Sequence, residues 1–395
     1  MVCLISGMVL SGCNTETLPV PPPPTLTRPT TSMTLSPDAT STTDQPSLTA
    51  SNSNTVPSEF VISSNKAEVV FPDTITFSLS GNAPGDIHSI NLVYGTDKHS
   101  LVSETNTIKP DFKPGKVVSA KWTWLMKKTG SLPPGAKIWW TWELTDEEGN
   151  TTSTPKESLI YSDTRFTWES IKSATMDIYW HDQDKAMIQE LTNEVESKVA
   201  RIQLNFVIPG ERKPRIFIYR SSEELRGAVL HEQEWTGAMA FPDYNIVLTA
   251  LNPDILEWAK MALPHEITHL IIGEAIFGPF GDIPTWLNEG LAQYAEGEME
   301  DYLKQALDDA IQNKSLISLL SLVSNFPTNT AQAYLAYAES NSVVRYLLET
   351  YGWEKMNQLI SIFKDGSTYD NALEKVYAFD TGMLEAKWKA AIGAQ

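Results

Sequence analysis

The 395-residue chain contains only two cysteines, Cys3 and Cys13, and both lie at its extreme N-terminus. The rest of the chain therefore cannot hold a disulfide framework, a cysteine-ligated zinc site or a cysteine nucleophile. Basic residues are also few, with 30 Lys and Arg against 49 Asp and Glu, which gives a net charge of −19. Such an acidic chain argues against sequence-independent nucleic-acid binding and against a polybasic membrane patch. No apolar run reaches the roughly 18 residues that a membrane-spanning helix needs.

The N-terminus has the anatomy of an export signal. Residues 2–12 are mostly apolar or small and match the length of a signal-peptide hydrophobic region. They end in Leu10-Ser11-Gly12-Cys13, which resembles the lipobox of bacterial lipoproteins. The resemblance implies a lipoprotein signal peptide at 1–13 and a lipid on Cys13 that anchors an exported protein to the membrane, at the bacterial cell surface or the periplasmic face. An ordinary signal peptide with a chance cysteine is the alternative, since no Lys or Arg precedes the apolar run.

Two segments with different compositions follow. Residues 14–57 are rich in Pro, Thr and Ser with few charges, which predicts a disordered linker. Residues 58–162 alternate short β-rich runs with breaks such as Gly81–Gly85, which predicts an all-β sandwich. The run 138–146 followed by Gly149-Asn150 resembles a late strand and turn of an immunoglobulin-like or fibronectin-like module. Its tryptophans suggest contact with cell-wall glycans, but strand alternation places about half of them in the core, so a spacer is the default role.

The remainder, 163–395, changes from strands to helices. Expected strands at 176–180, 215–219 and 246–249 are interspersed with expected helices at 182–204 and 221–230, and nearly everything after residue 253 has a helical pattern. Strands first and helices later predict an α+β domain.

The motif His265-Glu266-Ile267-Thr268-His269 lies in this second domain. On a helix, positions i and i+4 share a face, so both imidazoles can converge on one metal ion with Glu266 beside its open position. A site of this kind needs a third protein ligand. Glu289 follows His269 by 20 residues, beyond a Gly- and Pro-rich turn, and suits that role. Pro264 either opens the helix at its first turn or kinks a longer one. The four other histidines, which lack ligand spacing, are expected in the core or at the surface: His88, His99, His181 and His231.

Together with Trp286-Leu287-Asn288-Glu289-Gly290, the motif resembles the gluzincin zinc metallopeptidases, in their peptidase MA-like branch related to the M1 aminopeptidases. Gly237-Ala238-Met239-Ala240-Phe241 resembles that family's edge-strand motif Gly-Ala-Met-Glu-Asn, and Tyr337-x-x-Ser340 resembles the segment with its transition-state tyrosine. The resemblance implies a thermolysin-like fold and one Zn²⁺ per chain. The implied roles are metal ligation by His265, His269 and Glu289, general-base catalysis by Glu266, oxyanion binding by Tyr337 (Tyr334 is the alternative) and substrate binding by Gly237, Ala238, Met239 and Ala240.

One departure from the family pattern bears on the reaction. In the aminopeptidases, the Glu of the edge-strand motif binds the free amino terminus of the substrate, and this chain has Ala240 there. We therefore predict a surface-tethered endopeptidase that acts on peptides or unfolded protein. An aminopeptidase that uses another acidic group, and a non-catalytic binding lipoprotein that keeps the fold, are the alternatives. Gln293 and Glu296 follow Glu289 at i+4 and i+7 and are candidates for orienting the ligands, with a solvated helix face as the alternative. Asn288 is expected either to hydrogen-bond near the substrate or to cap a turn.

Overall fold

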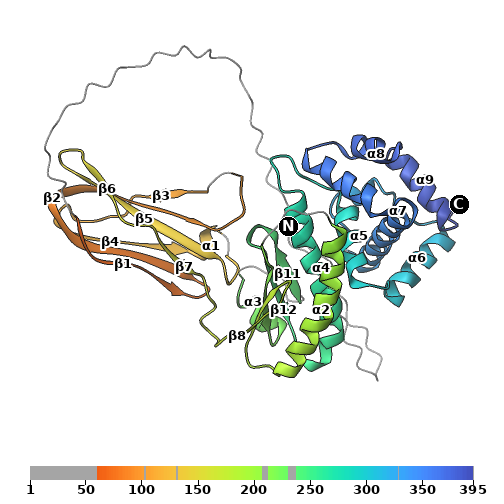
Figure 1. Ribbon diagram of the computed structural model, residues 1–395, viewed down its shortest axis with the longest axis horizontal. Helices are drawn as coiled ribbons and strands as arrows, with labels where there is room; N and C mark the ends of the chain where they lie inside the picture. Colours follow the sequence, from red (N-terminus) through yellow and green to blue (C-terminus); the bar gives the residue numbers. More distant parts are fainter. Residues whose placement is uncertain are drawn as a thin grey trace, which may run out of the picture.

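The computed structural model describes residues 60–101, 104–129, 132–206, 212–229, 237–327 and 329–394. The predictions for the signal peptide 1–13, for Cys13 and for the linker 14–57 lie outside these residues. The described chain forms a β domain followed by a domain of strands and helices (Figure 1). No helix in these segments has both the length and the apolar character to cross a bilayer.

The β domain is organised around one long strand, β2 (Thr74–Thr96). The first half of β2 pairs with β1 (Val61–Val70) and β4 (Gly115–Leu125), and its second half pairs with β3 (Asn106–Ile108) and β5 (Lys137–Asp146). Two short strands, β6 (Thr151–Ser153) and β7 (Glu157–Ile160), complete the other side of β5. A single helical turn, α1 (Met126–Thr129), follows β4.

The expected break at Gly81–Gly85 is wrong, because β2 continues through it with only a register shift between Asn82 and Ile87. A side chain on Gly81 would begin 2.5 Å from the carbonyl oxygen of Val61, so this glycine permits a close approach of β1 instead of making a turn. Trp124, Trp140 and Trp142 are buried in the core of this domain. The likeness to immunoglobulin or fibronectin modules stays a prediction.

A second sheet opens the other domain. Its strand order is β11-β12-β10-β9-β8, so β11 is an edge strand. The strands are β8 (Glu169–Lys172), β9 (Asp177–Trp180), β10 (Arg215–Tyr219), β11 (Ala238–Phe241) and β12 (Ile246–Ala250). Strands β9, β10 and β12 are parallel, and β11 and β8 run antiparallel to their neighbours.

The two faces of this sheet pack against different partners. Alternate side chains such as Ile216 and Ile218 of β10 belong to the core shared with helices α2 (Lys185–Asn205) and α4 (Leu256–Ala275). Their neighbours Phe217 and Tyr219 belong to the core of the β domain. Helix α2 presents its buried stripe at helical spacing, as an amphipathic helix does; the stripe is Ile188, Leu191, Val195, Val199 and Ile202. The sheet is therefore covered by helices on one face and by the β domain on the other.

The rest of the chain is helical, as expected. Short 3₁₀ turns occur at Pro242–Tyr244, Pro253–Ile255 and Ser321–Val323. The helices are α3 (Ser222–Arg226), α5 (Thr285–Glu296), α6 (Asp301–Asn313), α7 (Thr330–Lys364), α8 (Tyr369–Tyr377) and α9 (Thr381–Ala391). Helix α5 packs between α4 and α7, and α7 bends at Gly352, whose φ is 76°. This arrangement confirms a multidomain chain in which a β-rich region precedes an α+β domain.

Candidate metal centre

Helix α4 carries the histidine motif in a long buried segment. Pro264 lies inside this helix, which begins at Leu256, so the structure selects the longer helix over one that opens at the proline. Proline has no backbone N–H, so the carbonyl of Lys260 one turn earlier has no helical donor. The ammonium group of Lys198, on α2, donates to that carbonyl at 3.0 Å. Helix α2 thus supplies a donor in place of the backbone hydrogen bond that is missing immediately before the motif.

The three predicted metal ligands come together. One ligand atom each from His265, His269 and Glu289 lies within 4.8 Å of the others, and all three residues are buried. The Glu289 Oε2 atom is 3.5 Å from His265 Nε2 and 3.7 Å from His269 Nε2. Ligands about 2.0–2.2 Å from a tetrahedral zinc ion are separated by about 3.4 Å. The Nε2 atoms of His265 and His269 have no hydrogen-bond partner among the described residues. Three buried ligand atoms that converge in this way, two of them imidazole nitrogens, fit a zinc ion.

The other nitrogen of each imidazole is held by a neighbour. His265 Nδ1 lies 2.7 Å from Glu296 Oε1, which also accepts a hydrogen bond from Gln293 Nε2 at 2.7 Å. His269 Nδ1 lies 3.0 Å from Asn288 Oδ1. With Nδ1–H donating to these oxygens, both Nε2 atoms face Glu289. The expected orienting role of Gln293 and Glu296 is consistent with these contacts. The contact of Asn288 with His269 was not among the expectations for that residue.

Burial and charge set the pKa values in this cluster. Burial acts to lower the pKa of His265, but the carboxylates of Glu289 and Glu296 outweigh it and raise that pKa to about 10. Burial dominates at His269 and lowers its pKa to about 4. Burial also raises the pKa of Glu266 to about 8, although His265 and the backbone of Ala240 act against this shift. A buried carboxyl with a pKa near neutrality suits proton transfer.

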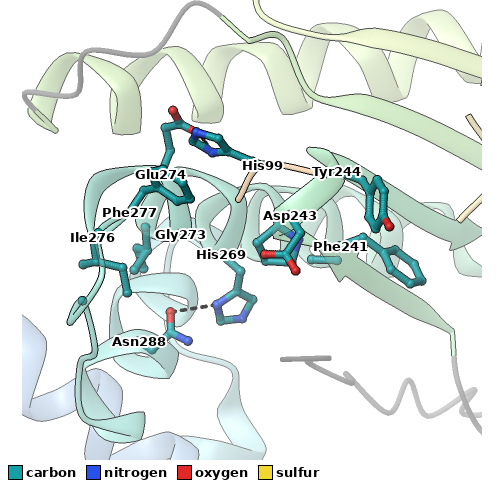
Figure 2. Close-up of a pocket in the computed structure, with 15 residues that line it drawn as sticks. His99, Phe241, Asp243, Tyr244, His269, Gly273, Glu274, Ile276, Phe277 and Asn288 are labelled. Atoms are coloured by element: carbon teal, nitrogen blue, oxygen red, sulfur yellow. Dashed lines mark hydrogen bonds and ion pairs between the residues drawn. The ribbon is translucent and has the colours of Figure 1, made fainter. Parts of the chain in front are cut away.

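A cavity of about 320 Å³ adjoins the cluster. His269 and Asn288 lie on one side of it, and Phe241 of the edge strand lies on another (Figure 2). Ala240 of the same strand also lines the cavity. Of the four residues predicted to bind substrate, Ala240 lines this cavity. Ala238 and Met239 are fully buried in the sheet, and a side chain on Gly237 would begin 2.8 Å from the Trp258 ring. The edge strand therefore borders the cavity through its last residues.

The two candidate tyrosines lie on α7 and are half-buried. Tyr337 packs its ring edge-on against Phe326 at 5.1 Å, and Tyr334 packs against Tyr302 at 5.0 Å. Glu296 helps to raise the pKa of Tyr302, after burial, so this second pair lies on the Glu296 side of the cluster. Neither Tyr334 nor Tyr337 is among the described residues that line the cavity. The catalytic role of Tyr337 stays a prediction.

Sequence reasoning missed one residue of the site. His99, from the β domain, lines the same cavity as His269. Nothing in the sequence predicts this position, because His99 lies far from the motif along the chain and lacks ligand spacing. The packing of one domain on the other brings it to the cavity.

Comparison with known proteins identifies the family. A model of the Peptidase MA superfamily matches residues 177–394, more than half of the chain, so the chain belongs to this superfamily. The M1 zinc metallopeptidase from Deinococcus radiodurans is similar at 11% identity, with 81% of this chain and 89% of that chain covered and a TM-score of 0.32. An aminopeptidase N family protein from Idiomarina loihiensis is similar at 10% identity over 82% of this chain and 70% of that one, with a TM-score of 0.32. No curated protein matches this chain.

Proposed function

We propose that this protein is a zinc-dependent metallopeptidase that cleaves peptide bonds inside extended chains. The observation that carries the proposal is the cluster of His265, His269 and Glu289, whose three buried ligand atoms lie within 4.8 Å of one another. Glu266, one residue from the first ligand, completes the set that zinc-assisted hydrolysis requires. Membership of the Peptidase MA superfamily agrees with this chemistry.

The residues divide the work as follows. His265 and His269, through Nε2, and Glu289, through Oε2, would hold the metal. When bound, Zn²⁺ lowers the pKa of water and polarises the scissile carbonyl. The Glu266 carboxylate accepts the proton of the attacking water and delivers a proton to the leaving amine. Glu296 and Asn288 fix the imidazole rings through Nδ1, which directs each Nε2 atom at the metal position.

The edge strand supports internal cleavage. Strand β11 pairs only with β12 in the described sheet, so its other edge can take an extended peptide as an added strand. Ala240 has no group that binds an ammonium ion, and the cavity continues past it along Phe241, Asp243 and Tyr244. A bound peptide can therefore extend past Ala240 in both directions and need not have its amino terminus beside that residue. This favours an endopeptidase.

Mass-spectrometric mapping of cleavage in a mixed peptide library tests this proposal. The zinc-loaded full chain is compared with its Glu266→Gln variant at equal zinc content. Internal cuts in the wild type that fall at least 100-fold in the variant are expected. An unchanged rate in the variant would remove Glu266 from the reaction, and no cleavage by either protein would favour the non-catalytic binding lipoprotein.

An aminopeptidase is the second candidate, because Asp243 places a carboxylate on the rim of the cavity. That carboxylate could bind a free amino terminus in place of the missing acidic group at position 240, but it already lies 3.4 Å from the ammonium group of Lys98. The same library separates the two candidates. Stepwise loss of N-terminal residues, abolished by N-acetylation of the peptides, would replace the endopeptidase with the aminopeptidase.

We further propose that the protein is exported and attached to the bacterial membrane through a lipid on Cys13, with residues 14–57 as a tether. The lipobox-like sequence before Cys13 supports this location. Metabolic labelling of the wild type with a fatty acid, and loss of the label in Cys13→Ser, is the expected result.

A glycan contact of the β domain is tested by sedimentation of the full chain with purified cell wall, where co-sedimentation is expected if the contact exists.

A further inference from the structure

The β domain contributes directly to the cavity beside the metal centre. His99 follows β2 in the β domain and makes three contacts with the other domain. Its backbone N–H donates to the carbonyl of Asp243 at 2.7 Å. Its ring stacks on Phe277 with a centroid separation of 3.5 Å and an interplanar angle of 12°, and its Nδ1 lies 3.2 Å from Glu274 Oε2. These contacts fix the ring of His99 as a wall of the cavity.

The cavity has a mainly apolar wall. Figure 2 shows His99 stacked with Phe277 on the side away from Asn288, with Phe241 and Tyr244 across from Phe277. Phe241, Tyr244 and Phe277 are half-buried and line the cavity. Ile272 and Ile276 add aliphatic surface. A volume of about 320 Å³ is that of a small ligand pocket and exceeds the space that a few waters need.

Two carboxylates also line the cavity, but each already has a basic partner. Asp243 lies 3.4 Å from Lys98. Glu274 lies 3.1 Å from Arg212 and 3.2 Å from His99. A lysine or arginine side chain entering the cavity would have to compete with these pairs. The aromatic and aliphatic wall, by contrast, gains by losing contact with water when an apolar group covers it.

We propose that His99, Phe277, Tyr244 and Phe241 form a substrate subsite that takes a bulky aromatic or branched aliphatic side chain of the bound peptide. The occupant is the substrate because the cavity is continuous with the metal ligand His269 and with the free edge of β11. The β domain thereby selects substrate through His99 and is more than a spacer. This inference rests on the proposed peptidase function.

The test uses the zinc-loaded full chain and peptides that differ at one position near the cut, with Phe, Leu, Ala or Lys. The wild type is expected to prefer Phe and Leu over Ala and Lys at one position by at least tenfold in kcat/KM. His99→Ala should reduce this preference to less than threefold, through KM, with kcat and zinc content unchanged. His99→Trp, which fills the cavity, should reverse it in favour of Ala. His88→Ala, at an exposed histidine of the same domain, is the matched control and should change nothing.

A binding measurement separates this inference from the proposed reaction. Fluorescence anisotropy reports peptide binding to the Glu266→Gln protein with and without His99→Ala, after thermal unfolding confirms that both are folded. A tenfold weaker binding of Phe peptides on His99→Ala supports the subsite even if the wild type cleaves nothing, in which case only the proposed reaction fails. Cleavage with an unchanged preference in both His99 variants, or a wild-type preference for Lys, overturns the subsite and leaves the peptidase. No binding and no cleavage overturn both.

Discussion

Glu296 holds one of the three predicted metal ligands in place. Its side chain is 9% exposed and accepts hydrogen bonds from His265 and Gln293. Glu296→Gln should weaken zinc binding about 10–100-fold, because an amide holds the imidazole of His265 and supports its basicity less well. Competitive titration with a chromophoric chelator measures this affinity. Glu298→Gln, at an exposed residue of the adjoining turn, is the control, and equal effects of the two substitutions would remove the orienting role of Glu296.

At this scale, the sequence predicts what local spacing determines. The ligands His265 and His269 follow from i, i+4 geometry on one helix, and Glu296 follows from its i+7 spacing to Glu289 on another. His99 does not follow from any such spacing, since it reaches the cavity only through the packing of one domain on the other. The roles of Ala238 and Met239 were predicted from a motif, but sheet burial withdraws their side chains from the cavity.

At the scale of elements, α5 lies so close to α7 that one glycine decides the contact. A side chain on Gly290 would begin 2.4 Å from the carbonyl oxygen of Ser340 and 2.6 Å from a methyl group of Val344. Gly290→Ala should therefore lower the free energy of unfolding by about 1–3 kcal/mol, and displace the helix that carries Glu289. Chemical denaturation and zinc titration measure the two effects.

The matched control for this helix contact is Gly382→Ala on α9, where the nearest atom to the new side chain lies at 3.6 Å. Because alanine is the better helix former, this change should be neutral or stabilise by up to about 1 kcal/mol. A stability loss at Gly382 as large as that at Gly290 would contradict the close-contact explanation.

Helix α7 also carries a buried carboxyl that makes stability depend on pH. Burial raises the pKa of Glu339 to about 8, against the opposing hydrogen bond from the Ile317 N–H. The unfolded chain releases this proton near pH 4–5 while the folded chain keeps it, so the folded state binds more protons up to about pH 8. The free energy of unfolding should therefore fall as pH rises through this window, by up to about 1 kcal/mol per pH unit from this group.

Glu339→Gln removes the titrating group and should make the variant progressively more stable than the wild type from pH 5 to pH 8, with no further gain above. Urea denaturation at each pH gives the comparison. Glu349→Gln, at an exposed position of the same helix, should show no such trend. A constant difference between Glu339→Gln and wild type across this range would contradict a buried proton.

The elements themselves were largely predictable, and the failures have local causes. Short, largely apolar runs predict strands β9, β10 and β12 within one or two residues of their observed bounds. The Gly- and Pro-rich run at 81–85 also looks like a turn, but β4 pairs with β2 on both sides of it, and β2 continues through a register shift. Pro264 allowed two predictions for the start of this helix. The sequence could not show that Lys198 of α2 donates to the carbonyl of Lys260, the group that the proline leaves without its usual donor in the longer helix.

At the scale of the whole molecule, the two domains share a core. Side chains from one face of the second sheet, including Phe217 and Tyr219, lie in the same apolar cluster as those of the β domain. Arg215 crosses the junction, because its guanidinium group donates to the carbonyl oxygens of Gly135 at 2.5 Å and Tyr244 at 2.9 Å. No spacing in the sequence predicts this junction, because the β domain and the second sheet come from different segments of the chain and the pattern of each segment predicts only its own strands and helices.

A shared core predicts that the domains unfold together, since exposing the covered face of the sheet costs both of them apolar contacts. Differential scanning calorimetry of the full chain should therefore show one cooperative transition. Arg215→Gln should lower the midpoint of that single transition by removing charge-assisted bonds across the junction, a loss of about 1.5–3 kcal/mol. Arg220→Gln, whose ion pair with Asp182 lies outside the junction, should shift it far less. Two separate transitions in the wild type would mean that the β domain folds independently, and His99 would then reach the cavity only while the domains are docked.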